Sequence, residues 1–142
     1  MAFIIHQEGL MYLFQTALTE AQSVPANFYL GLYNDATPEE ADTLVQVTAM
    51  ETTGTGYARQ EIPSSAAGFT VGIVGDDVDA VATQETFTAG GTWSAVNRWF
   101  IATTVDNAGK LICSGDVSPA RTLGNTDTLK VTATLRGQNV GE

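Results

Sequence analysis

The feature that most constrains the fold is a series of short segments with alternating apolar and polar residues, which fills the chain after about residue 25. The clearest is residues 129–136, where every second side chain is apolar: Leu129, Val131, Ala133 and Leu135. Such alternation predicts a strand with one face on a core. About seven or eight segments recur at roughly ten-residue spacing, as in sandwiches and barrels. The sequence therefore predicts a mainly β protein, a β-sandwich or jelly-roll-like domain.

The other expected strands share this pattern and are bounded by turn residues. In residues 26–33, Phe28, Leu30 and Leu32 take one face, and Tyr29 and Tyr33 take the other, so both faces are expected to be covered. Residues 93–105 form the longest β run, and the turn at 106–109 predicts a hairpin to residues 110–115. Residues 44–50 are only weakly patterned. The remaining expected strands are residues 57–62 and 69–73, and residues 78–81 and 85–89 are expected to form two short strands or one bulged strand.

One helix is expected before the strands, over residues 9–21. Its apolar side chains recur with helical spacing and form one face: Leu10, Leu13, Phe14, Ala17, Leu18 and Ala21. Pro25 follows shortly after the pattern stops. Docking of this face on the protein's own sheet is the favoured interpretation, and docking on a partner is the alternative.

The length of 142 residues fits one domain. We expect an N-terminal arm and helix over residues 1–24, the sandwich over 25–137 and a frayed tail over 138–142. The first residues lack the basic start of a signal peptide, and no stretch approaches a membrane-spanning length. We therefore expect synthesis in the cytoplasm of the producing host cell.

The charge balance narrows the classes of partner. Sixteen acidic residues against six basic ones give a formal net charge of -10. This argues against nucleic acid and against anionic membranes, both of which attract basic surfaces. Charged residues are only 15% of the chain. Weakly charged surfaces suit subunit contacts, although Thr-rich exposed strand faces are an equal explanation.

The chain has few side chains suited to catalysis. His6 is the only histidine, too few for most zinc sites and triads, and we expect it to be disordered or at a surface contact. The single Cys113 is expected to be a buried structural thiol. No phosphate-binding glycine loop is present. We therefore expect no catalytic residues, no cofactor, no metal and no enzyme activity.

Acidic residues offer two alternatives, neither favoured. A glycosidase needs two acids across a cleft, and Glu61, Glu85 and Asp116 are candidates, but each flanks a strand or turn where acids are usually solvated. The loop Asp76-Asp77-Val78-Asp79 could contribute to a calcium site, yet it lacks the spacing of a known calcium loop. A solvated acidic turn is the favoured interpretation.

Aromatic and basic residues supply the interface candidates. Trp93 and Trp99 share a face if their strand is unbroken, and Phe100 points the opposite way. Core packing is favoured, with an interface anchor as the alternative. Arginine is scarce, and ion pairs within or between subunits are the simplest roles for it. The residues that we single out for an interface are Phe3, Ile5, Tyr12, Tyr33, Arg59, Trp93, Arg98 and Arg121.

Several short motifs follow the expected helix in order: Phe28-Tyr29-Leu30-Gly31-Leu32-Tyr33-Asn34-Asp35, Gly56-Tyr57-Ala58-Arg59, Thr86-Phe87-Thr88-Ala89, Arg98-Trp99-Phe100-Ile101, Gly109-Lys110-Leu111, Ala120-Arg121-Thr122 and Asp127-Thr128-Leu129-Lys130-Val131. From residue 9 to residue 135 the chain resembles a group of small virion structural proteins of tailed bacteriophages, although residues 43–54 match nothing in it. Members of this group pair an N-terminal helix with a β-sandwich or jelly-roll-like domain.

The resemblance implies a function without catalytic residues. It implies a capsid cement or decoration protein that binds the major capsid protein and copies of itself, on the capsid surface of the virion. Such a homo-oligomer would stabilise the shell because it binds only the assembled form. The alternative is a tail, fibre or baseplate module that recognises a host surface or another virion protein.

Overall fold

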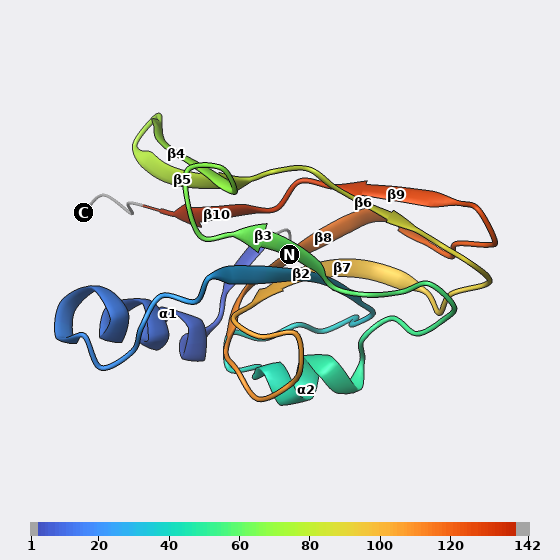
Figure 1. The fold of residues 1–142 in the computed structure, drawn as a ribbon, viewed down its shortest axis with the longest axis horizontal. Helices are drawn as coiled ribbons and strands as arrows, with labels where there is room; N and C mark the ends of the chain where they lie inside the picture. Colours follow the sequence, from blue (N-terminus) through green and yellow to red (C-terminus); the bar gives the residue numbers. More distant parts are fainter. Residues whose placement is uncertain (1–2, 139–142) are drawn as a thin grey trace.

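The computed structural model describes residues 3–138, which form two layers of antiparallel strands flanked by two helices (Figure 1). One layer is a five-stranded sheet in the order β1-β8-β7-β2-β3. Its strands are β1 (Phe3–Ile5), β2 (Asn27–Tyr33), β3 (Gln60–Pro63), β7 (Val96–Ala102) and β8 (Leu111–Arg121). The mainly β fold with an N-terminal helix confirms the predicted class.

The second layer consists of a three-stranded sheet, β10-β5-β4, and a two-stranded sheet, β6-β9. Its strands are β4 (Phe69–Val74), β5 (Asp77–Ala82), β6 (Glu85–Thr88), β9 (Thr128–Val131) and β10 (Thr134–Gly137). The prediction of a single strand over residues 129–136 is therefore wrong, because one strand ends at Val131 and the next begins at Thr134. The segment from β5 to β6 is interrupted at the corresponding place. The two paired segments, β5–β6 and β9–β10, therefore both cross there between the three-stranded and the two-stranded sheet.

The core lies between the layers, and the predicted alternation in β2 is confirmed. Leu30 and Leu32 are 0% exposed and belong to the inter-layer core, whereas Tyr33 faces the other side of the sheet. Gly31 lies against the Phe100 ring, where a Cβ atom would come within 2.3 Å of a ring carbon. The longest predicted run, 93–105, is strand only over β7, and Trp93 precedes it. Trp93 and Trp99 nevertheless both pack in the core.

Helix α2 (Leu44–Ala49) covers the outer face of the five-stranded sheet. Leu44 and Val47 pack there with Tyr33 and Phe100. The weak apolar pattern did not predict this six-residue helix. Its start is marked by a capping box, in which Thr43 accepts a bond from the Gln46 backbone and the Gln46 side chain accepts one from Thr43.

The N-terminal helix is real, but its predicted orientation is wrong. α1 (Gln7–Phe14) continues as one wider turn, η1 (Gln15–Thr19). The side toward the sheet carries Gly9 and Tyr12, and at Gly9 a Cβ atom would lie 2.5 Å from backbone atoms of β8. The apolar face predicted to dock on the sheet is mostly in solvent: Leu10 is 40% exposed, Phe14 56% and Leu18 75%.

The chain ends differ from expectation at the N-terminus. Residues Phe3 to Ile5 pair with β8 as an edge strand, where an arm was predicted. The carboxylate of Glu8 then accepts backbone N–H bonds from Leu44 at 2.8 Å and Leu111 at 2.6 Å, which ties α1 to α2 and β8. Most of the predicted frayed tail, residues 139–142, lies outside the described residues. No helix of the described chain is long and apolar enough to cross a membrane.

Candidate functional site

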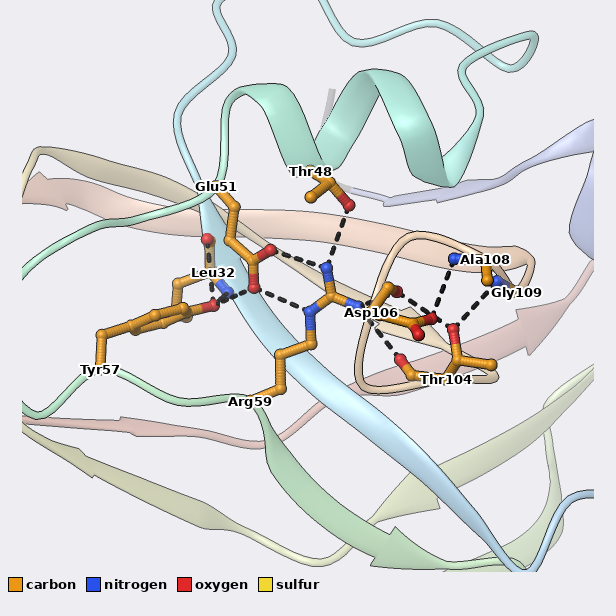
Figure 2. A network of polar contacts seen from close by, with 9 residues as sticks. All are labelled: Leu32, Thr48, Glu51, Tyr57, Arg59, Thr104, Asp106, Ala108 and Gly109. Atoms are coloured by element: carbon orange, nitrogen blue, oxygen red, sulfur yellow. Dashed lines mark hydrogen bonds and ion pairs between the residues drawn. The ribbon is translucent and has the colours of Figure 1, made fainter.

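A densely connected polar group is the guanidinium of Arg59, which precedes β3 (Figure 2). Its Nε and Nη2 donate to the two carboxylate oxygens of Glu51 at 2.8 and 2.7 Å. Nη2 also donates to Thr48 Oγ1 at 3.0 Å, and Nη1 donates to the carbonyls of Thr104 and Asp106 at 3.0 and 2.7 Å. All five N–H groups of the side chain are thus satisfied.

This arginine network is screened from water. The side chain of Arg59 is 3% exposed and that of Glu51 13%. The guanidinium carbon also lies 4.9 Å from the centroid of the Phe100 ring. The Tyr57 hydroxyl donates to Glu51 at 2.7 Å and accepts from the Leu32 backbone at 2.9 Å. Burial, and then the Glu51 charge, raise the pKa of Tyr57, so this phenol stays protonated at neutral pH.

The network joins segments that are distant in sequence. Figure 2 shows the end of α2, the segment before β3, strand β2 and the β7–β8 loop meeting at Arg59. Because all five donors of the guanidinium bond to the protein itself, none of them is left for a ligand. Its geometry fits a structural clamp on α2 and the β7–β8 loop.

A second arginine network lies on β2, β7 and β8 beside the start of α1, and it includes the only histidine. Arg98 is 1% exposed; it donates to the Tyr33 hydroxyl and Ser114 Oγ, both at 2.9 Å, and forms an ion pair with Asp116. His6 Nε2 lies 2.8 Å from the same Ser114 oxygen. The expectation of a disordered or surface His6 is wrong: the side chain is 0% exposed because β1 pairs with β8.

The contact between His6 and Ser114 has the length of a nucleophile–base pair, but it has no access from solvent. Both residues are 0% exposed. Burial lowers the pKa of His6, so the neutral imidazole is favoured. Its Nδ1 has no hydrogen-bond partner among the described residues. The arrangement is suited to holding the N-terminal segment on β8.

The remaining chemical candidates are dispersed. Cys113 is fully buried, as predicted, and burial raises the pKa of its thiol. Asp79 is held by Arg136 through bonds of 2.6 and 2.7 Å, which lower the pKa of that carboxyl. Glu61 lies in β3 and Glu85 in β6, in opposite layers. Over residues 3–138, no group of three or more potential ligands is arranged to hold a metal ion.

Five of the eight interface candidates are buried within the subunit: Tyr12, Tyr33, Arg59, Trp93 and Arg98. Trp93 is typical, because its ring packs edge-on to Tyr57 and its Nε1 donates to the Thr55 carbonyl at 2.8 Å. Phe3 and Ile5 are half-buried in β1, and Arg121 is exposed at the end of β8. The predicted ion pairs are present for Arg59 and Arg98.

The exposed surfaces that the favoured interpretation of the sequence placed in the core are apolar. The outward face of α1 and η1 exposes Leu10, Met11, Phe14 and Leu18, and docking of this face on a partner was the alternative interpretation. On the other side of an open apolar groove, β4 exposes Val71 and Ile73. The groove has a volume of about 490 Å³, and its walls include Leu13, Phe28, Phe69, Val71 and Leu135. Exposed apolar patches of this kind usually mark contact sites.

Two comparisons with known proteins bear on identity. A family model described as "Podophage GP4 fiber I protein gp80" matches residues 11–135, which is most of the chain. In the second comparison, none of the curated proteins matches this chain.

Proposed function

We propose a function on the premise that this chain belongs to the family of the podophage GP4 fiber I protein gp80, whose model covers residues 11–135. Membership makes the chain a structural component of a bacteriophage virion. Our proposal is narrower: the chain is a subunit of a tail fibre or of its attachment, it works by binding other proteins, and it catalyses no reaction.

The family match is the observation on which the proposal depends. The resemblance in the sequence indicated the right broad class, the virion proteins of tailed phages. It favoured capsid cement or decoration proteins, whereas the matched family is a fibre family. We therefore adopt the tail and fibre alternative and do not propose the major capsid protein as the partner.

The geometry supports a role in protein contact. Arg59 directs all its donors to the chain itself, and His6 and Ser114 are inaccessible, so these polar clusters serve the fold. The side chains left outside are apolar, above all Phe14 and Leu18 on the helix. Burying such surface against copies of this chain or another virion protein is favourable, at about 25 cal/mol per Å² of apolar area.

Immunogold electron microscopy of intact virions tests the proposal. Antibodies raised against the folded chain are expected to label the tail region, with pre-adsorption to the purified chain as the control. Labelling distributed over the capsid surface would contradict a fibre role and support the cement alternative.

A further inference from the structure

Strand β4 has an open side. It is the outer strand of the sheet β10-β5-β4, and no strand within residues 3–138 pairs with its free edge. Its sequence, Phe-Thr-Val-Gly-Ile-Val, contains no charge and no proline. Natural proteins usually protect edge strands with charges, prolines or bulges. β4 has none of these, and Val71 and Ile73 are 68% and 80% exposed.

The backbone of β4 has hydrogen-bonding groups directed toward that open edge. The Thr83 N–H donates to the Gly68 carbonyl at 2.9 Å, so the residues that face β5 follow Gly68 at every second position. Val71 and Ile73 lie between them and point their N–H and C=O groups outward. The far side of β5 agrees, since Ala82 donates to the Ala133 carbonyl before β10. Such a row of groups is a template for pairing with another extended strand.

We propose that β4 pairs antiparallel with β4 of a second copy of this chain, across a two-fold axis at Gly72. The proposal rests on the proposed function, because a virion structural subunit meets other copies of itself. In this register Val71 lies opposite Ile73 of the partner subunit and Ile73 opposite Val71 of the partner subunit. Val71 and Ile73 of each strand are then hydrogen-bonded to the partner subunit, and the two sheets join into one of six strands.

The charge distribution favours this antiparallel arrangement. The chain is strongly acidic, and Asp76 follows β4 in the turn. Across the two-fold axis, Asp76 lies opposite Gly68 of the partner subunit, within the uncharged segment 65–68. The two Asp76 residues are eight positions apart along the strands, roughly 27 Å, which is about three Debye lengths at physiological salt. A parallel pair would place the two acidic turns side by side.

Gly72 gives a direct test of the register. A Cβ atom there would have nothing within 4 Å in the isolated subunit. On the two-fold axis it forms a non-hydrogen-bonded pair, with Cα atoms about 4.5 Å apart, a separation that a disulfide tolerates. Thr70 is the matched position, since it lies opposite Val74 of the partner subunit and roughly 13 Å along the strand from Thr70 of the partner subunit.

The first experiment compares Gly72→Cys with Thr70→Cys in the full chain, oxidised with glutathione disulfide and analysed on non-reducing gels. Cys113 is buried, and the wild-type chain controls for any reaction of its thiol. We expect Gly72→Cys to form a covalent dimer at least ten-fold faster than Thr70→Cys. Equal rates, or no dimer from Gly72→Cys, would overturn the proposed pairing.

The second experiment is sedimentation equilibrium of the wild type, Val71→Pro and Val71→Thr. Val71→Pro removes an outward N–H and leaves the bonds to β5 in place, whereas Val71→Thr keeps the N–H and the branched side chain. We expect dimers that Val71→Pro weakens at least ten-fold and Val71→Thr less than three-fold. A wild type that stays monomeric at millimolar concentration, or equal effects of both variants, would refute the inference. Antibody labelling of virions decides the proposed function independently, because it does not depend on self-association.

Discussion

The buried Arg59 network leads to our most quantitative prediction, the effect of Arg59→Ala on stability. The substitution removes five hydrogen bonds and leaves Glu51, whose side chain is 13% exposed, without its counter-ion. Removing one partner of a buried ion pair typically costs about 3–5 kcal/mol, because the other charge stays buried. We expect a loss of that size in the free energy of unfolding.

The expected loss translates into a melting temperature. With an unfolding entropy of about 2.1 cal/mol/K per residue, the 142-residue chain has roughly 0.3 kcal/mol/K in total. A loss of about 3–5 kcal/mol therefore lowers Tm by roughly 10–17 °C. Differential scanning calorimetry measures Tm, and urea unfolding gives the free energy.

Graded variants keep this prediction testable if Arg59→Ala does not fold. Thr48→Ala removes one bond to the guanidinium and should cost about 1 kcal/mol. Arg59→Lys keeps the charge but not the forked geometry, so it should fall between these two variants. Arg121→Ala is the matched control at an exposed arginine and should change Tm by less than about 2 °C. An Arg59→Ala protein as stable as Arg121→Ala would refute the reasoning.

Three further predictions concern the N-terminal segment and the core. Burial lowers the pKa of His6, so the stability that the neutral side chain contributes is present above pH 6.5 and declines below it. Urea unfolding between pH 7.5 and 5.5 should show this loss of stability. His6→Gln should abolish this pH dependence. If the two pH profiles coincide, the assignment to His6 is wrong. Gly9→Ala should destabilise the fold by about 1–3 kcal/mol, although alanine has the better helix propensity, because the added Cβ meets the β8 backbone. The control variant Gly72→Ala should be nearly neutral in thermal unfolding, because its Cβ meets nothing within 4 Å. Equal effects would mean that α1 is not docked as described. Cys113 should react with a thiol reagent only in denaturant, since burial raises its pKa and excludes the reagent; rapid labelling of the native chain would contradict this.

The strands were the most predictable part of the fold. Alternation located β2 and β4 to within a few residues. In β2 the alternating side chains bury one face in the core, whereas in β4 Val71 and Ile73 stay exposed. It could not show that the last segment divides between two sheets, since the side chains from Leu129 to Leu135 alternate without interruption across the break at Thr132. Pairing partners decide that break, and they lie elsewhere in the chain.

The helices show what periodicity leaves undecided. The apolar stripe of α1 correctly indicated a helix, but the helix docks through Gly9 and Tyr12 and leaves Phe14 in solvent. A stripe identifies an apolar face without showing what covers it. Helix α2 has only about one and a half turns, which is too short for a periodic apolar pattern. The sequence signal that marks this helix is the capping box that begins at Thr43.

The polar clusters depended on long-range contacts. The prediction that Arg59 and Arg98 form ion pairs is confirmed, since a scarce positive charge in an acidic chain finds an acid. The burial of His6 was not predictable, because its partner Ser114 is 108 positions away in the sequence. Such a contact exists only once β1 has paired with β8.

The measurement that tests the central claim most directly is the copy number of this chain per virion, by quantitative mass spectrometry against the major capsid protein. A fibre subunit should be present at a small fraction of the number of capsid subunits. A count close to that of the capsid protein would place the chain on the shell and contradict the fibre assignment.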